Sequence, residues 1–470
     1  MLRHSILTLA LTAVAATAAL AQHTAGGGID TRMLDAMRRA EAAAPVSRAL
    51  SNALAANSID DLVRSRTAAA NMPRHFSVET SRQAIEDQKS SGRCWMFSGL
   101  SVLRADFARM HHDTLAVTFS HDYLFFYDLL EKSNLMLQGV VDCAREPMES
   151  ERVRFFFRAP VGDGGTFCGV ADLVDKYGLV PSCVMPDAHQ GSNTGRMRSL
   201  LASLLRQGGL ELRRMVAQGK SAKAVSQRKE AILADVYHML CLMLGEPPAQ
   251  FTYAHRDSDG HVRTEARTYT PASFRDEVVG RRLGGSFVML MNDPRRPYHK
   301  TYEVEWDRHT YDGTNWCYLN LPMEEIEPLA IAQLRDGRKL YSSYDVGKQL
   351  DRINGYCDTD NYDYATLLGT AFTMTKAERI ATFDSGSTHA MTLAAVDLDA
   401  AGAPTAWRVE NSWGAAWGQA GSLVMTQRWW RDYMFRLVVD KAYVPEVLLR
   451  EAQQKPTLVM PEDPLFLPDE

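Results

Sequence analysis

The chain has 470 residues, of which 46% are hydrophobic and 23% are charged, and its formal net charge at pH 7 is −5. This is the composition of an ordinary globular protein, long enough for two or three domains or for one domain with large insertions. Nucleic acid is not among the expected partners, because proteins that bind it usually carry a clear excess of Lys and Arg.

The first 21 residues have the features of a secretory signal peptide. Arg3 supplies a weakly basic start, residues 6–20 are apolar and rich in Ala, and Ala19-Leu20-Ala21 offers the small residues that a signal peptidase reads. The apolar stretch is short for a membrane span, and an uncleaved anchor or an amphipathic leader is the alternative. We expect cleavage near Ala21 and a periplasmic or extracellular mature protein that is not embedded in a membrane.

Helical patterning dominates the N-terminal half. After Gly26-Gly27-Gly28, which has the composition of a flexible linker, residues 30–70 have helical composition without β-branched runs. Further helices are expected over residues 94–107, 120–131, 170–177 and, as a long block with apolar stripes, 195–245. The long block contains no obvious chemistry and is interpreted as a helical insertion.

From about residue 285 the apolar residues follow the period of strands. Strands are expected over residues 286–291, 302–306, 316–321, 388–396, 405–410, 422–426 and 435–439. The tail, residues 455–470, is rich in Pro and acidic residues and is expected to be extended. A helical N-terminal half and a strand-rich C-terminal half indicate an α+β fold with two lobes.

Seven cysteines occur at positions 94, 143, 168, 183, 241, 317 and 357. An exported protein can pair up to six of them, and the sequence leaves open whether any disulfide forms. None stands in a CxxC pair or at a spacing from His that is typical of zinc sites, so no metal or other cofactor is expected. Most are interpreted as small buried apolar side chains, with Cys94 as the exception.

The segment before the first of these helices reads Gln-Lys-Ser-Ser-Gly-Arg-Cys-Trp over residues 88–95. A Cys in the first turn of a helix has its thiolate stabilised by unpaired backbone N–H groups and by the helix dipole. Gly92 lets a substrate backbone approach closely. Gln88 stands six residues before Cys94, where its amide can donate to a developing oxyanion beside the Cys94 backbone N–H. The segment therefore predicts a nucleophilic thiol with an oxyanion hole.

The partner base of a catalytic Cys is expected far away in the sequence. His389 begins an apolar strand that would hold its ring rigidly, and Asn411 follows 22 residues later in the sequence Glu-Asn-Ser-Trp-Gly. Asn411 can orient the imidazole, and Trp413 can shield that hydrogen bond from water. Together with Cys94 these residues match the nucleophile, base and orienting group of a Cys-His-Asn triad.

Each feature alone has an ordinary explanation. Cys-Trp at a helix start can be core packing, His389 can be a satisfied polar residue, and Asn-Ser-Trp-Gly can be a turn with a buried Trp. Their conjunction in this order along the chain favours a thiol peptidase. Other histidines are interpreted as structural or solvated: His111, His112, His121, His299 and His309.

Several short motifs, in order over roughly residues 75–450, point to one family. They are Gln88–Trp95 with Arg93 before the Cys, Asp163–Gly165, Lys176–Pro181, Asn292–Arg295, Tyr318–Pro322, Asp345–Lys348, Asp358–Asp360, Tyr362–Tyr364, Thr388–Met391 and Glu410–Gly414. The set resembles bleomycin hydrolase and bacterial aminopeptidase C, the self-compartmentalising branch of the papain-like cysteine peptidases. His389 follows Cys94 by 295 residues, against roughly 130–150 in a minimal papain, which matches the large insertions of this branch.

The resemblance implies a papain-like two-lobed fold, with a helical N-terminal lobe, a β-barrel-like C-terminal lobe, the helical insertion and a C-terminal arm. The implied domains are a signal peptide (1–21), an N-terminal linker and helical segment (22–75), the peptidase domain (76–454) and the arm (455–470). It also implies a homohexamer with active sites facing an inner chamber. In such a protein the arm lies in the cleft, where its terminal carboxylate, here that of Glu470, anchors the substrate's free α-amine.

The implied function is that of a cysteine aminopeptidase, which hydrolyses N-terminal residues of peptides through a thioester acyl-enzyme. Cys94, His389 and Asn411 are its expected catalytic residues, and Gln88 its oxyanion-hole residue. Two alternatives stay open. One is an exported endopeptidase whose arm leaves the cleft unrestricted, and the other is a non-catalytic binding or scaffold protein that retains the fold.

Overall fold

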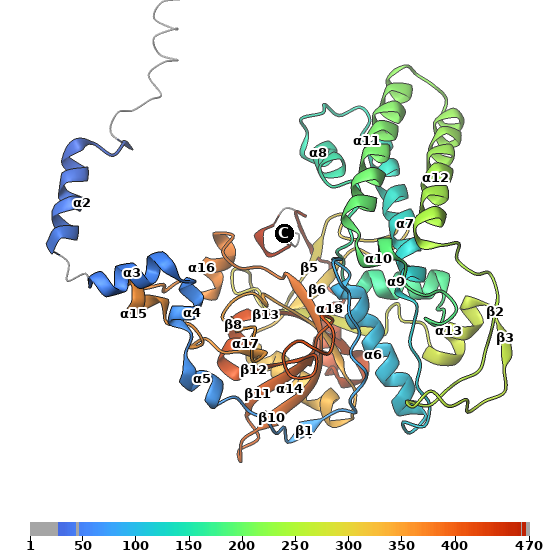
Figure 1. The fold of residues 1–470 in the computed structure, drawn as a ribbon. Coiled ribbons are helices and arrows are strands. Elements are labelled where there is room, and N and C mark those ends of the chain that lie inside the picture. The colour runs from blue at the N-terminus through green and yellow to red at the C-terminus, as the bar shows by residue number, and fades with distance from the viewer. Residues whose placement is uncertain (1–26, 44–46, 462, 467–470) are drawn as a thin grey trace, which may run out of the picture. The chain divides into compact units, whose positions relative to one another are not determined.

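Seventeen α-helices, a twelve-stranded mixed sheet and a two-stranded sheet make up the described part of this computed structural model (Figure 1). The residues that it describes are 27–43, 47–461 and 463–466. Helices combined with one large sheet confirm a mixed α/β fold. The chain separates into two units, residues 1–62 and 63–470.

The first unit is helical in its described part. Its helices are α2 (Thr31–Ala43), α3 (Arg48–Ala56) and most of α4 (Ile59–Val63). No described side chain of α2 or α3 is buried, so these helices have no apolar core of their own. The helical composition predicted for residues 30–70 is confirmed, and α5 (Arg66–Ala70) continues it in the second unit. The predicted signal peptide, residues 1–21, lies outside the described residues.

Most helices of the second unit lie between residues 94 and 280. They are α6 (Cys94–Met110), α7 (His121–Asp142), α8 (Glu151–Arg158), α9 (Phe167–Tyr177), α10 (His189–Ser192), α11 (Gly195–Ala217), α12 (Ala222–Leu244) and α13 (Pro271–Val279). The block predicted over 195–245 is confirmed as α11 and α12, which pack against α7. Helix α7 runs past its predicted end at residue 131, because Leu135, Met136 and Val140 continue its buried face. Among the described helices, none combines the length and the apolar character that a membrane crossing requires.

The large sheet is built mainly from residues after 285. Its strands in spatial order are β14 (Thr457–Val459), β5 (Lys300–Val304), β6 (Cys317–Asn320), β4 (Phe287–Met291), β13 (Met434–Asp440), β7 (Leu340–Tyr344), β10 (His389–Leu398), β11 (Pro404–Glu410), β12 (Ser422–Thr426), β9 (Tyr356–Cys357) and β8 (Leu350–Asp351), with β1 (Val78–Glu79) also paired to β10. Strands β2 (Phe251–Tyr253) and β3 (Arg267–Tyr269) form the smaller sheet. Every predicted strand overlaps an observed one, whereas the central strand β7 is absent from the prediction.

Shorter helices and the C-terminal arm complete the second unit. The helices are α14 (Met323–Arg335), α15 (Tyr364–Leu368), α16 (Lys376–Ala381), α17 (Gln427–Tyr433) and α18 (Glu446–Ala452). In the arm, β14 pairs with β5, and then a 3-10 turn, η3 (Pro464–Phe466), interrupts the extended course that the tail's composition predicts. Arg295 and Arg296 bind the Asp463 carboxylate at 2.7 and 2.5 Å, and Leu465 is fully buried. These contacts fix the described end of the arm.

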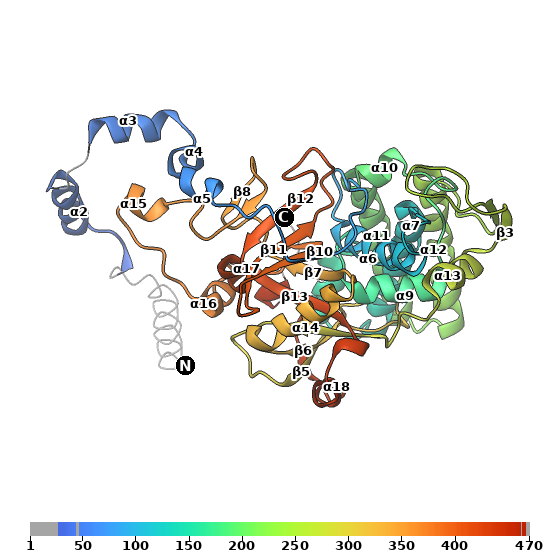
Figure 2. The same ribbon diagram turned by 90° about the horizontal axis from the view of Figure 1, so that it is seen from below.

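Helix α6 lies between the sheet and helices α7, α9, α11 and α12 (Figure 2). It packs against β10, where the Thr392 hydroxyl donates to the Ser98 carbonyl of α6 at 3.3 Å. Cys94 is the first residue of α6, and His389 is the first residue of β10. The packing of this helix on this strand therefore brings two residues that are distant in the sequence to the same part of the fold.

Candidate active site

Cys94 occupies the first position of α6, and its side chain is almost completely buried. Backbone hydrogen bonds within the helix begin at the N–H of Met96, which donates to the Arg93 carbonyl at 2.9 Å. The N–H groups of Cys94 and Trp95 precede the first of these bonds, and the dipoles at this helix end favour a thiolate. The predicted place of Cys94 at a helix start is confirmed.

The residue before the thiol is a fully buried arginine. Arg93 Nη1 donates to Asp122 Oδ1 at 2.7 Å, and neither side chain has exposed surface. Asp122 also accepts the backbone N–H of Ala188 at 2.6 Å. Burial raises the pKa of Asp122, and the charge of Arg93 opposes that rise. The ion pair ties the start of α6 to the start of α7.

Asp163 holds the loop in front of Cys94 from the opposite side. Its Oδ2 accepts the backbone N–H of Gly92 at 2.8 Å, and its carbonyl accepts the Trp95 indole N–H at 2.7 Å. A Cβ on Gly92 would come within 2.7 Å of the Asp163 carboxylate, so only glycine allows this contact. Burial alone would raise the pKa of Asp163, but hydrogen bonds from Thr194 and Gly92 and the charge of Arg198 hold it below its usual value. Asp163 belongs to one of the family motifs found in the sequence, but only the structure reveals this role.

Gln88 is connected to the segment that carries Asn411. Its backbone N–H donates to the Ser412 carbonyl at 2.8 Å, and the Ser412 hydroxyl donates to Gln88 Oε1 at 2.5 Å. One N–H of the Gln88 amide donates to the Ser91 carbonyl at 2.5 Å. Because Ser412 fixes the oxygen side of the amide, the nitrogen side is oriented as well, and its second N–H is left for another acceptor.

His389 and Asn411 form the hydrogen bond that the sequence predicts. His389 Nε2 and Asn411 Oδ1 are 2.8 Å apart, and Asn411 Oδ1 also accepts the Ser412 backbone N–H at 2.8 Å. The ring centroids of Trp413 and His389 are 4.9 Å apart, and His389 is buried. Burial lowers the pKa of His389 to about 4, against the opposing effect of the Asn411 hydrogen bond. With Nε2 engaged by Asn411, Nδ1 is the ring nitrogen left for proton exchange.

A buried ion pair holds Glu410, the residue that precedes Asn411. Lys339 Nζ donates to both carboxylate oxygens of Glu410, at 2.6 and 2.7 Å, and both side chains are buried. Burial lowers the pKa of Lys339, while Glu410 acts in the opposite direction. Glu410 belongs to a predicted motif, but nothing in the sequence connects it to Lys339, which stands 71 residues earlier.

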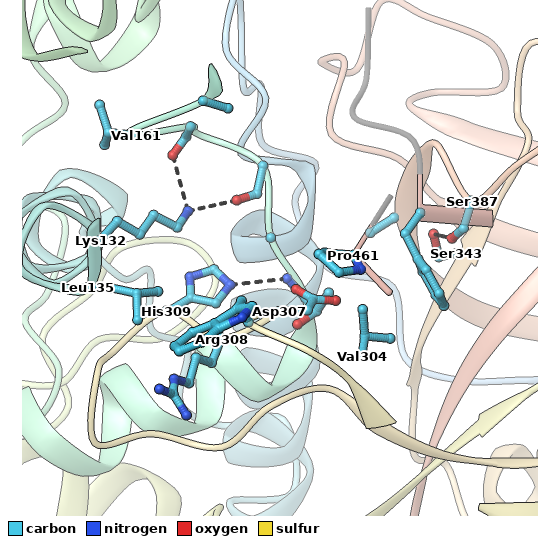
Figure 3. A pocket seen from close by; sticks show the side chains of 18 of the residues that line it. Lys132, Leu135, Val161, Val304, Asp307, Arg308, His309, Ser343, Ser387 and Pro461 are labelled. Atoms are coloured by element: carbon cyan, nitrogen blue, oxygen red, sulfur yellow. Dashed lines mark hydrogen bonds between the residues drawn. The ribbon is translucent and has the colours of Figure 1, made fainter. Parts of the chain in front are cut away.

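Cys94 and His389 line one pocket of about 370 Å³ (Figure 3). Figure 3 shows Lys132 and His309 on one side of this pocket and Ser343 on the other. Its lining also includes Leu135 of α7, Trp306, Asp307 and Arg308 of the segment after β5, Tyr341 of β7, Arg436 of β13, and Pro461 and Phe466 of the arm. Elements from across the whole second unit therefore meet at one cavity that contains a thiol and an imidazole.

His309 contributes to the wall of the pocket without facing solvent. Its Nδ1 and Asp128 Oδ1 are 2.5 Å apart, and its Nε2 accepts the backbone N–H of Thr166 at 3.4 Å. Lys132 binds the other oxygen of Asp128 at 2.8 Å. His309 is therefore buried and hydrogen-bonded through both ring nitrogens, so it is not solvated.

Glu470 is the residue predicted to anchor the substrate's α-amine. It lies outside the described residues, so its anchoring role stays a prediction. Among the described residues, Asp257, Asp259 and His261 lie close enough together to share a cation, and they do not line the Cys94 pocket. All seven cysteines are described, and none forms a disulfide.

Known proteins share this fold and much of this sequence. Aminopeptidase C of Streptococcus thermophilus is 35% identical over 421 residues, which are 89% of this chain and 94% of that one. Bleomycin hydrolase of Homo sapiens is 34% identical over 397 residues, which are 83% and 87% of the two chains. The crystal structure of PepW from Lactobacillus rhamnosis is 34% identical, covers 94% of this chain and 99% of its own, and superposes with a TM-score of 0.89. Since a model of the Peptidase C1-like family also matches residues 28–466, the chain belongs to that family.

Proposed function

We propose that this protein is a cysteine aminopeptidase that hydrolyses the N-terminal residues of peptides. The observation that carries the proposal is the shared pocket, which is lined by a thiol at a helix start and by an imidazole bonded to Asn411. Relatives named aminopeptidase C and bleomycin hydrolase support the same activity. The expected catalytic residues are Cys94, His389 and Asn411.

The proposed mechanism passes through a thioester. The Cys94 thiolate attacks the carbonyl carbon of the scissile bond, and His389 carries the thiol proton to the departing amine. The low pKa of the buried His389 makes its protonated form a strong acid towards that amine. Water then attacks the thioester while His389 takes its proton, which releases the acid product and restores the thiol. Asn411 keeps the ring in the required orientation throughout.

Replacing Gln88 with Ala should lower kcat by about 10²–10³-fold with little change in KM. The amide N–H of Gln88 is proposed to bind the oxyanion, which exists only in the transition state and the intermediate, so its loss affects the chemical step. Steady-state kinetics on a free-amine peptide amide measure the effect. Gln138→Ala on α7 is the matched control, since that side chain does not line the Cys94 pocket and instead donates to Asp142 and accepts from Lys229. A fall in kcat of less than about tenfold for the Gln88 variant would remove it from the oxyanion hole.

The restriction to N-terminal residues is proposed to come from the arm, residues 455–470, with the Glu470 carboxylate as the anchor for the substrate's free α-amine. Asp463, held by two arginines, keeps the arm in place, and Pro461 and Phe466 of the arm line the pocket. These contacts support the proposal, because they bring the arm to the cavity that contains the thiol.

A matched pair of fluorogenic peptides, one with a free α-amine and one N-acetylated, tests this restriction. The free peptide should have a kcat/KM about 10- to 100-fold higher, because a charged hydrogen bond to its amine is worth about 1.5–3 kcal/mol. Deleting residues 467–470 should bring the two values close together, while the packed Leu465 and Phe466 remain in the chain. Rapid cleavage of the acetylated peptide by the full chain, with none of the free one, would instead identify an endopeptidase.

The finer architecture is part of the same proposal. We propose a papain-like arrangement of a helical lobe and a β-barrel-like lobe, with α11 and α12 as the helical insertion. The proposed domains are a signal peptide (1–21), an N-terminal linker and helical segment (22–75), a peptidase domain (76–454) and the arm. The position of Cys94 on a helix and of His389 on a strand supports a cleft between two such lobes.

Export and assembly complete the proposal. A basic start, an apolar stretch and small residues at 19–21 support cleavage near Ala21 and a periplasmic or extracellular location. A homohexamer is proposed for the mature protein because its sequence resembles the bleomycin hydrolase and aminopeptidase C branch. Light scattering of the purified protein measures the subunit number, and a monomer at micromolar concentration would contradict the hexamer.

A further inference from the structure

Arg436 on β13 is a buried arginine in the wall of the Cys94 pocket. Its side chain is only 6% exposed, and its guanidinium lies over the rings of Trp316 and Phe466, at 5.0 and 5.4 Å from their centroids. The two aromatic rings contact the guanidinium group of Arg436. They do not occupy its hydrogen-bond donors, which need acceptors in the plane of the guanidinium.

No carboxylate of the described residues lies within 4.0 Å of this guanidinium, and its Nε has no hydrogen-bond partner. The other buried arginines in the described part of the chain each form an ion pair, and they are Arg93, Arg104, Arg275 and Arg408. Burying a charge without a partner costs free energy that the rest of the fold must offset. An anionic ligand in the pocket would supply the missing partner.

The register of the sheet places Arg436 near the start of β10, the strand that begins with His389. Arg436 is opposite Ser343 of β7, and Ser343 is opposite Ala390 of β10, the residue after His389. Residues opposite each other on neighbouring strands face the same side of a sheet, and all three line the pocket. Two strand spacings put Arg436 about 10 Å from the strand of His389. The small side chains of Ser343 and Ala390 leave space over the strands for a substrate side chain between them.

The other charges of the pocket leave it with an excess of positive charge. Lys132 is already paired with Asp128. Arg308 lies over the rings of Trp306 and Tyr311. The acid among the lining residues, Asp307, forms no ion pair within 4.0 Å, and burial raises its pKa against the charges of Arg436, His309 and Lys132. The Glu470 carboxylate proposed for the cleft is balanced by the substrate's α-ammonium group. Among the described lining residues, two unpaired guanidinium groups then face one carboxyl group, and a second carboxylate balances the charge.

We infer that Arg436 determines specificity by binding the carboxylate of an acidic side chain, that of the substrate residue whose carbonyl carbon Cys94 attacks. The inference rests on the proposed peptidase activity and narrows its substrate class to peptides that begin with Glu or Asp. Arg436 is not a catalytic residue here, because it contacts the side chain of the substrate and not the reacting atoms.

Free-amine fluorogenic substrates that carry Glu, Gln or Lys before the scissile bond test the inference. The wild-type protein should cleave the Glu substrate with a kcat/KM about 10- to 100-fold above that of the Gln substrate, and the Lys substrate least well. Arg436→Gln should abolish the preference for Glu over Gln, and Arg436→Glu should make Lys the best of the three. Arg428→Gln on α17, whose partner is the exposed Asp360, should keep the wild-type order. An equal kcat/KM for Glu and Gln in the wild type, or an unchanged order in Arg436→Glu, would overturn the inference.

Two further measurements separate this inference from the proposed function. If no substrate is cleaved, the proposed function fails, and calorimetric binding of the Glu and Gln peptides to Cys94→Ala still decides the role of Arg436. Tighter binding of the Glu peptide by about tenfold supports it, and equal binding refutes it. Arg436→Met should raise Tm, because it removes an unpaired buried charge, while a purely structural arginine would lower Tm when replaced.

Discussion

Replacing Cys94 with Ala should reduce peptide hydrolysis by about a millionfold, leaving only the acceleration that substrate binding and the oxyanion hole supply. Removing the nucleophile of a triad costs nearly all that the triad contributes, because the base and the orienting group then have nothing to activate. The alanine fills most of the space of the thiol at the start of α6, so the fold should be retained. The measurement is kcat/KM on a free-amine peptide amide with equal Tm for the two proteins.

Thiol alkylation gives an independent form of the same experiment. Cys183 is exposed, so an alkylating reagent reaches it as well, and Cys183→Ala is the control that keeps the catalytic thiol. This control should be fully active and should lose its activity on alkylation, as the wild type does. Retention of hydrolysis by Cys94→Ala, or by the alkylated control, would show that another group performs the chemistry. Absence of hydrolysis in the wild type would instead identify a binding or scaffold protein.

Replacing Lys339 with Met should destabilise the protein by about 3–5 kcal/mol. Lys339 binds both oxygens of Glu410 deep in the fold, so its loss leaves a carboxylate buried without a partner. The double variant Lys339→Met, Glu410→Leu should recover most of this loss, because it removes the unpaired charge and fills the space with apolar atoms. Urea unfolding measures the free energies, and a double-mutant cycle gives the coupling between the two residues.

An exposed ion pair is the control for this experiment. Lys348 and Asp384 are 3.2 Å apart with about a third of each side chain accessible, so Lys348→Met should cost less than about 1 kcal/mol. If Lys339→Met also costs less than about 1 kcal/mol, then Glu410 has found water or another donor, and the pair does not hold the Asn411 segment in place.

The candidate catalytic residues could be identified because each carries a local signal. Gln88 and Cys94 stand at a fixed offset before a helical pattern, and His389 and Asn411 end up adjacent because β10 and β11 are neighbouring antiparallel strands. The long apolar stripes of the helices and the alternation of most strands were also visible in the sequence. These features depend on residues close together along the chain, which is why patterning alone was enough.

What could not be predicted depends on residues that are distant in the sequence. Strand β7 reads Leu-Tyr-Ser-Ser-Tyr, a composition without clear alternation, yet all five residues are buried because strands flank it on both sides. The partners of Asp163 and Lys339 come from other parts of the fold. For Arg436 the informative property is that no described acidic residue forms an ion pair with it, and this can be seen only when the residues around its guanidinium are known. Burial and pairing of charges are properties of the tertiary structure.

The hydrogen bond from Ser412 to Gln88 joins residues 324 positions apart. Closing so long a loop is slow compared with forming a helix such as α6, so the Gln88 amide acquires its orientation late in folding. During synthesis, a ribosome-bound chain displays the reactive thiol long before His389 and Asn411 emerge. Until then the thiol lacks its base, and the growing chain is protected from its own hydrolytic activity. The recovery of hydrolysis during refolding therefore measures when the C-terminal strands pack, and not when the helix that carries Cys94 forms.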